Sequence, residues 1–277
     1  MTTTRFEKYT IFQALHQRPG VFVIPNPWDA GSAKILAALG FEALATTSAG
    51  CAFSRGYLDS APEITRDVIL QNAKEIVEAT PLPVSADLQN GFGHDPKSCA
   101  ETIRLAANAG LAGGSIEDST GDSKNPIYDF QHAIERVAAA AEAAHASHFL
   151  LTARAENFLH GRPDLDDTIR RLQSFAEAGA DVLYAPGLSS VEAIRTVCAS
   201  VSKPVNVLLG LPGSALSVEE VAAVGAKRIS VGGSFARAAL GALVRAAREV
   251  KQKGTFSYTA DALPSAETKR YLASPAP

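Results

Sequence analysis

The sequence predicts an α/β fold, a (β/α)8 TIM barrel followed by an extra C-terminal helical segment. Eight short, nearly continuous apolar runs are typical of parallel strands covered on both faces, and they span residues 21–25, 43–47, 83–88, 112–117, 149–154, 181–185, 204–208 and 228–232. Between them, apolar residues recur with helical spacing over residues 30–39, 65–78, 98–109, 131–146, 165–178 and 191–200. This alternation has no break in composition, which favours a single barrel.

Glycines that end several predicted helices support the same fold. The next strand follows within two residues of Gly40, Gly110, Gly179 and Gly225. Glycine readily adopts the left-handed conformation that stops a helix and turns the chain back toward the sheet. An open, doubly wound sheet stays as the alternative architecture, although the loop at 26–29 lacks the glycine fingerprint of a dinucleotide site.

The chain is expected to form one large domain and a tail. Residues 1–253 form the barrel and end in a long helix over 234–253. Residues 254–277 form a helical tail with a short helix over 265–272. This tail could pack on its own barrel or on a neighbouring subunit.

Composition and charge exclude several classes of protein. The 277 residues are 46% hydrophobic and 20% charged, which excludes wholesale disorder, and no apolar run is long enough to predict a membrane-spanning helix. The net charge is -3 without a basic stripe, so nucleic acid is not an expected partner. Cys51, Cys99 and Cys198 are far apart, and the N-terminus has no apolar leader. We therefore expect reduced thiols in a cytoplasmic protein.

Charged side chains end three consecutive predicted strands. Asp87 ends the third strand, Glu117 the fourth and Arg154 the fifth, which places them at the mouth where barrel enzymes have their active sites. Two carboxylates on neighbouring strands repel each other unless a cation lies between them, and a hard divalent ion, Mg2+ or Mn2+, would satisfy both. Arg154 would then bind an anionic substrate. The alternative is that these residues form ordinary strand-end ion pairs.

Two long loops follow strands at this same end, over residues 48–63 and 118–129. Small residues at Ser48, Ala49 and Gly50 would let consecutive backbone N–H groups face an anion, although a plain turn explains them equally. Asp59 lies in the same loop, where a solvated aspartate is the alternative interpretation. We expect the second loop to close over the site as a lid, with Gly121 as its hinge.

Five motifs in a fixed order resemble those of the isocitrate lyase/phosphoenolpyruvate mutase superfamily. They are Trp-Asp-Ala-x-Ser-Ala at 28–33, Thr-Ser-Ala-Gly at 47–50, Asp-x-x-x-Gly-Phe-Gly at 87–93, Ile-Glu-Asp at 116–118 and Ala-Arg at 153–154. The resemblance implies a barrel that binds Mg2+ and a small 2-oxo acid or its phosphonate analogue. It also implies a homotetramer in which neighbours exchange a C-terminal helix.

The resemblance further implies roles for individual residues. The metal-side carboxylates fall on Asp59, Asp87 and Glu117, and the backbone oxyanion site falls on Ser48, Ala49 and Gly50. The substrate-binding arginine falls on Arg154, with a second at Arg237, and the mobile-loop residues of the mutases fall on Lys124 and Asn125.

Departures from the superfamily pattern narrow the expected function. Gln89 stands where a second metal-side carboxylate is usual, so it could hydrogen-bond a metal-bound water but adds no charge. The loop at 119–126 lacks the catalytic cysteine of the isocitrate and methylisocitrate lyases, and Pro186 replaces their strand-six glutamate.

The resemblance and its departures together favour an Mg2+-dependent lyase. It would cleave a C–C bond of an oxaloacetate-like 2-oxo acid through a metal-stabilised enolate. Three alternatives stay open: P–C bond chemistry as in phosphonopyruvate mutase or hydrolase, a disfavoured 2-methylisocitrate lyase-like cleavage, and a non-catalytic barrel that binds an anion.

Overall fold

The structure, a computed structural model, describes residues 3–211 and 216–273. Residues 1–2 and 212–215 of the predicted barrel domain, and 274–277 of the predicted tail, lie outside the described residues. Eight parallel strands form one sheet, in the order β1-β8-β7-β6-β5-β4-β3-β2. Their bounds are β1 Phe22–Ile24, β2 Leu44–Ala45, β3 Val84–Asp87, β4 Gly113–Glu117, β5 Leu150–Arg154, β6 Val182–Tyr184, β7 Val205–Leu208 and β8 Arg228–Ser230. The predicted barrel is confirmed.

The barrel closes between β1 and β2, the first and last members of this order. The backbone N–H of Ala45 donates to the Pro25 carbonyl (3.0 Å). The Asn26 side chain joins the same seam, because its amide donates to the Thr46 carbonyl (2.9 Å) and its oxygen accepts the backbone N–H groups of Val231 and Gly232 (both 2.9 Å). This single buried amide therefore connects the ends of β1, β2 and β8.

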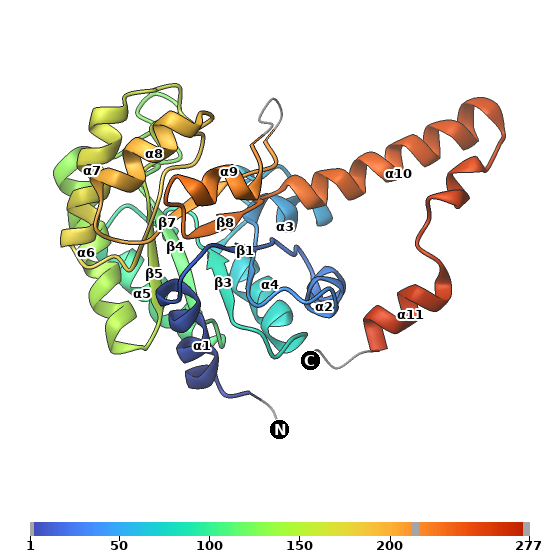
Figure 1. Cartoon of the computed structure of the whole chain (residues 1–277), viewed down its shortest axis with the longest axis horizontal. Helices are drawn as coiled ribbons and strands as arrows, with labels where there is room; N and C mark the ends of the chain where they lie inside the picture. The colour runs from blue at the N-terminus through green and yellow to red at the C-terminus, as the bar shows by residue number, and fades with distance from the viewer. Residues whose placement is uncertain (1–2, 212–215, 274–277) are drawn as a thin grey trace.

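Helices surround the sheet (Figure 1). Those that follow the strands are α2 Ala30–Ala38, α4 Arg66–Glu78, α5 Pro96–Asn108, α6 Phe130–Ala146, α7 Leu165–Glu177, α8 Val191–Ser200 and α9 Val218–Ala223. Alanines such as Ala106 and Ala140 are fully buried, and these small side chains allow close packing of α5 and α6. The four predicted glycine stops are confirmed, with φ between 87° and 105°.

Some helices of the structure lie where the sequence did not predict one. Helix α1, Arg5–Gln17, packs Phe12 and Leu15 against Phe22, Ile24 and Leu150 at the N-terminal end of the barrel. Helix α3, Ser48–Ser54, occupies the start of the predicted loop at 48–63, so the loop conformation expected there is wrong. The Thr47 hydroxyl accepts the Gly50 N–H (3.2 Å) and caps this helix.

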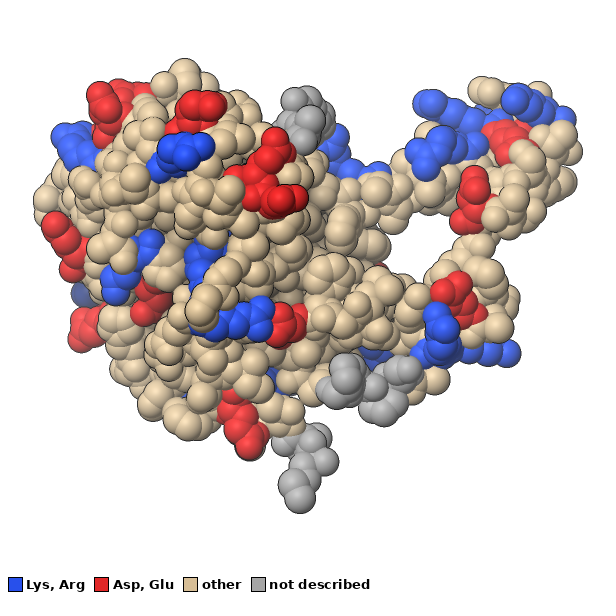
Figure 2. Space-filling model, viewed as in Figure 1, with Lys and Arg blue, Asp and Glu red and all other residues tan. Residues whose placement is uncertain are grey.

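Helix α10, Ser234–Lys253, projects away from the barrel (Figure 1). A short 3-10 helix, η1 Ser257–Ala260, follows it, and α11 Ser265–Ala273 returns to pack against α2. Both predicted C-terminal helices are thus confirmed. Along α10 only Ala236 is buried, and Figure 2 shows open space enclosed by α10, the tail and the barrel. Within the described ranges, no helix is long and apolar enough to span a membrane.

Candidate active site

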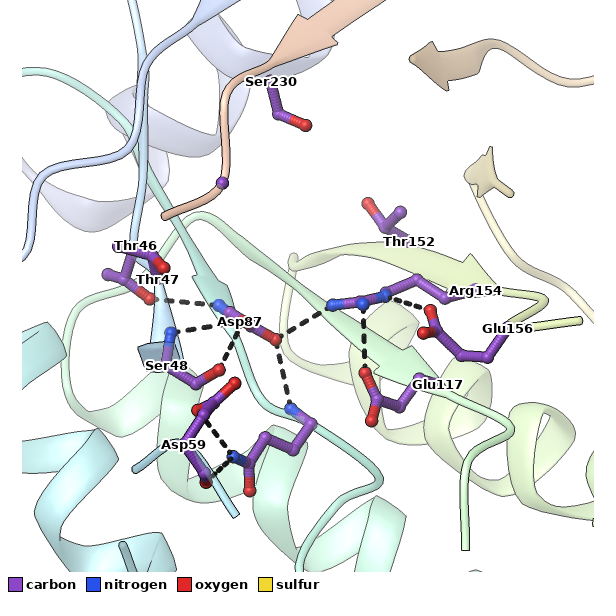
Figure 3. A network of polar contacts seen from close by, with 12 residues as sticks. Thr46, Thr47, Ser48, Asp59, Asp87, Glu117, Thr152, Arg154, Glu156 and Ser230 are labelled. Carbon is purple, nitrogen blue, oxygen red and sulfur yellow. Dashed lines mark hydrogen bonds and ion pairs between the residues drawn. The ribbon is translucent and has the colours of Figure 1, made fainter. Parts of the chain in front are cut away.

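Arg154 lies at the centre of a cluster of carboxylates at the C-terminal ends of the strands (Figure 3). Its Nη1 lies 3.1 Å from Asp87 Oδ1, its Nη2 3.2 Å from Glu117 Oε2, and its Nε 2.8 Å from Glu156 Oε1. Asp87, Glu117 and Arg154 therefore meet at the mouth, as their strand-end positions predict. The cation between the two carboxylates in this structure is the arginine itself.

Glu156 is the member of this cluster that the sequence analysis missed. Its side chain is 3% exposed, and its backbone N–H donates to Asp118 Oδ1 (2.8 Å). Asp118 is in turn paired with Arg171 of α7 (3.1 Å). The available signal was the spacing, because Glu156 follows Arg154 by two residues at the strand end. Glu156 fixes the orientation of the Arg154 guanidinium by accepting a hydrogen bond from the Arg154 Nε–H.

Asp87 is held in place by the segment after β2. The Ser48 hydroxyl and backbone N–H donate to Asp87 Oδ2 (2.8 and 3.2 Å), and the Asp87 N–H donates to Thr46 Oγ1 (3.0 Å). Two of the three backbone N–H groups expected to face a substrate anion therefore already have partners within the protein. The Ser48 N–H donates to Asp87, and the Gly50 N–H donates to the Thr47 hydroxyl. Ser48 and Ala49 still line the cavity.

Asp59 and Gln89 meet beside Asp87. The Gln89 side-chain amide lies 3.4 Å from Asp59 Oδ1, and Gln89 has a left-handed φ of 47°. Burial raises the pKa of Asp59, and the nearby charge of Asp87 raises it further. Gln89 therefore contacts a carboxylate through its neutral amide, at the position where the superfamily usually has a further acid.

The cluster contains more carboxyl groups than basic groups. Three carboxyl groups, those of Asp87, Glu117 and Glu156, contact the guanidinium of Arg154. A fourth, that of Asp59, lies near enough to feel its charge. Burial, only partly offset by Arg154, raises the pKa of Glu117 well above its ordinary value. Burial alone would lower the pKa of Arg154, but Glu156, Glu117 and Asp87 outweigh it and raise that pKa.

This donor chemistry fits Mg2+ or Mn2+, which prefer oxygen ligands and would supply the missing positive charge. Asp87, with Asp59 and Glu117, would hold the ion. Within the described part of the chain, however, no three His, Cys, Asp or Glu side chains form a ready ligand cluster. Arg154 lies between Asp87 and Glu117, which accounts for this arrangement.

A cavity of about 230 Å³ opens above the strands and is lined by Asp59, Asp87 and Arg154. Further polar residues that the sequence analysis did not single out line it too, namely Tyr184, Asn206, Arg228 and Ser230. The signal for these was the alternation of inward-facing positions along β6, β7 and β8. An adjoining cavity of about 670 Å³ is lined by Asp59, Gln89, Glu117 and the loop after β4.

Three predicted site residues lie away from these charges. Lys124 and Asn125 are exposed in the loop after β4, where Ser119 and Ile127 form an antiparallel bridge. The Asn125 amide contacts Asp122 within that loop (3.4 Å). Arg237 is exposed on α10 and lines neither cavity. The structure thus assembles the strand-end residues but does not bring these three to them.

Comparison with known proteins gives a consistent result. A family model described as phosphoenolpyruvate phosphomutase matches residues 12–251. The structure of a candidate lyase/mutase from Burkholderia cenocepacia J2315 is 56% identical with a TM-score of 0.95, covering 98% of this chain and 97% of that chain. The structure of 2,3-dimethylmalate lyase is 26% identical with a TM-score of 0.84, covering 96% and 94%. The 2-methylisocitrate lyase of Escherichia coli (strain K12) is 26% identical over 200 residues, 70% of this chain and 67% of that one.

Proposed function

The chain belongs to the phosphoenolpyruvate phosphomutase family, and on that premise we propose that it is a divalent-metal-dependent lyase. Its substrate would be a small, oxaloacetate-like 2-oxo acid, and the bond cleaved a C–C bond. The observation that carries the proposal is the excess of oxygen ligands at Asp59, Asp87 and Glu117 beside the guanidinium of Arg154. Relatives named as C–C lyases support the reaction class.

Arg154 would bind the substrate, and its neighbours would hold the binding groups in position. Arg154 has five N–H groups, three of which face carboxylates, so two stay available for an anionic group of the substrate. Glu156 holds the guanidinium in its plane, and Ser48 orients Asp87. When bound, Mg2+ or Mn2+ would polarise the 2-oxo group as a Lewis acid.

The loop after β4 would act as a lid. It borders the cavity that contains Asp59, Gln89 and Glu117, so closure would exclude water from the site. Lys124 and Asn125 lie on this loop, and closure would carry them toward the substrate. Gly121, with a φ of 79° and open space around it, suits the hinge.

The proposed assembly is a homotetramer whose contacts involve α10. Leu240 and Leu243 of α10 are 41% and 64% exposed, and with Trp28 and Phe53 they line an apolar groove between α3 and α10. A helix with this much exposed apolar surface is typical of one that packs against another subunit.

A second candidate is phosphonate chemistry, which the description of the matching family model favours. Cleavage of 2-methylisocitrate is disfavoured, because the loop at 119–126 contains no cysteine.

The decisive assay is turnover of a substrate panel with and without divalent metal. Oxaloacetate, other 2-oxo acids, 2-methylisocitrate and phosphonopyruvate are each incubated with Mg2+, Mn2+ or EDTA, with coupled detection of 2-oxo acid products and phosphorus NMR. We expect metal-dependent C–C cleavage that falls by at least about 10²-fold in Asp87→Asn but not in the surface control Asp166→Asn. Turnover that is the same with and without metal and in Asp87→Asn would contradict the proposal. Turnover of phosphonopyruvate alone, seen as new phosphorus products, would contradict it too.

A further inference from the structure

The cavity that contains Arg154 has a second buried guanidinium at its floor. Arg228 begins β8, is 5% exposed and lines the same cavity. Register pairs join Glu117 to Arg154, Arg154 to Tyr184, Tyr184 to Asn206 and Asn206 to Arg228. Because registered residues of parallel strands share one face, this row of side chains lines the barrel interior from the rim at Arg154 to Arg228.

Every hydrogen-bond partner of Arg228 is neutral. Its Nε donates to Asn206 Oδ1 (2.8 Å) and its Nη2 to Thr152 Oγ1 (3.0 Å), while its Nη1 lies 3.3 Å from His16 Nε2. The His16 Nδ1–H donates to the Phe12 carbonyl (2.8 Å), so one neutral tautomer satisfies both ring nitrogens. Burial, with the charge of Arg228, lowers the pKa of His16 to about 3 and keeps the ring uncharged.

No negative charge compensates this cation within the described residues. No carboxylate of residues 3–211 or 216–273 forms an ion pair with Arg228, whereas Arg154 has three. Burial raises the pKa of the nearby Tyr184 to about 12, so its hydroxyl is also uncharged. A buried, unpaired cation is costly, and an anion that enters the cavity would relieve that cost.

The cavity thus has a group of carboxyl side chains around Arg154 at its rim and an unpaired positive charge at its floor. Thr152, which contacts Arg228, precedes Arg154 by two residues on β5 and lies beside it in Figure 3. Two residues along a strand span about 7 Å, so an acid with groups at Arg154 and Arg228 needs a short carbon chain. A four-carbon dicarboxylate has about this reach.

We propose that Arg228 binds a second carboxylate of the substrate, so that the protein selects short dicarboxylates over monocarboxylates. This inference rests on the proposed function for the identity of the cavity. The remote carboxylate of the substrate lies on the Nη atoms of Arg228, with Asn206 and Thr152 holding the guanidinium in place. The reacting end stays at the rim, next to Arg154 and Asp87.

The test measures the binding of acids that the proposed lyase would not cleave. Its result is therefore independent of the lyase proposal. Succinate, butyrate and 3-phosphonopropionate are titrated calorimetrically into the full chain in EDTA and again in Mg2+. We expect succinate to bind at least about tenfold more tightly than butyrate. This preference should be lost in Arg228→Gln and partly kept in Arg228→Lys. The matched control is Lys8→Gln, which removes another buried cation, one bonded to the Val77 and Thr80 carbonyls outside the cavity.

Three outcomes would overturn the inference. They are equal binding of succinate and butyrate by the native chain, a succinate preference that survives in Arg228→Gln, and tighter binding of 3-phosphonopropionate than of succinate. Thermal unfolding of each variant identifies loss of folding. If Arg228→Gln does not fold, the inference is tested by the preference for succinate over butyrate in the native chain and in Arg228→Lys. If the protein shows lyase turnover but Arg228 has no role in selectivity, only this inference is contradicted. If selectivity depends on Arg228 but no turnover is found, only the lyase proposal is contradicted.

Discussion

The Nη1 atom of Arg154 lies 3.1 Å from Oδ1 of Asp87, and the Ser48 hydroxyl lies 2.8 Å from the other oxygen of the same carboxylate. Asp87 is therefore fixed from two sides before any ligand arrives. Since Arg154 also contacts Glu117 and Glu156, one side chain compensates much of the charge at the mouth of the barrel.

Removing the guanidinium should destabilise the protein as well as inactivate it. In Arg154→Met, three partly or fully buried carboxylates lose their counter-charge, and we expect the free energy of unfolding to fall by about 3–5 kcal/mol. Urea denaturation at neutral pH measures this loss. Arg170→Met removes a side chain that is 61% exposed and should cost less than about 1 kcal/mol. Equal losses in the two variants would contradict the central position of Arg154.

Replacing Gln89 by glutamate should strengthen metal binding. The added carboxylate would lie beside Asp59 and Asp87, and we expect the affinity for Mg2+ and Mn2+ to rise about tenfold, or ~1.4 kcal/mol. Glutamate differs from glutamine only in its terminal group, so it should fit the left-handed backbone at this position (φ 47°) as well as glutamine does. Calorimetric titration of metal alone provides the measurement, with exposed Gln17→Glu as control. An unchanged affinity in Gln89→Glu would place the metal elsewhere.

Protonation of His16 should make the fold sensitive to acid. The pKa of His16 is lowered by burial to about 3 in the folded chain, against 6.5 when exposed. The unfolded chain therefore binds a proton that the folded chain cannot, and stability is lost as the pH falls from 6.5 toward 3, by about 1.4 kcal/mol per unit. The free energy of unfolding, measured by denaturation at several pH values between 7 and 5, should change less steeply with pH in His16→Gln than in the native chain. Replacing His145, which is 54% exposed, should leave the slope unchanged. Identical slopes in the native chain and His16→Gln would show that His16 titrates normally.

The exposed face of α10 should be needed for assembly. Leu243→Asp places a charge on its most exposed leucine, and we expect the molar mass from light scattering to fall toward that of one 29.0 kDa chain. Ile11→Asp, on α1 and 43% exposed, should keep the native mass. A native chain that is monomeric at micromolar concentration would contradict the proposed tetramer.

The sequence predicted the barrel well because its signals are local. Strands such as Phe22–Ile24 are short apolar runs, and Gly179 stops its helix through backbone conformation alone. Helix α1 escaped prediction because it buries the polar side chains Lys8 and His16, which weakens its apolar periodicity. Helix α3 escaped because Ser48-Ala49-Gly50 is equally typical of a turn.

The strand-end residues of the site were predictable, but their partners were not. Position along the chain places Asp87, Glu117 and Arg154 at one end of the barrel. It does not reveal that Arg154 pairs with both carboxylates, because a long side chain can reach several neighbours. Arg228 contacts Thr152 across the barrel, 76 residues away in sequence, and no local pattern indicates that contact.

A crystal structure with Mn2+ and oxalate tests the central claim most directly, because oxalate resembles the enolate formed from a 2-oxo acid and Mn2+ has an anomalous signal. We predict a manganese peak against Asp87, on the side of Asp59 and Glu117, with oxalate in the cavity beside Arg154. A structure in which both ligands are absent from this cavity at saturating concentration, or in which Mn2+ binds away from Asp87, would contradict the proposed active site.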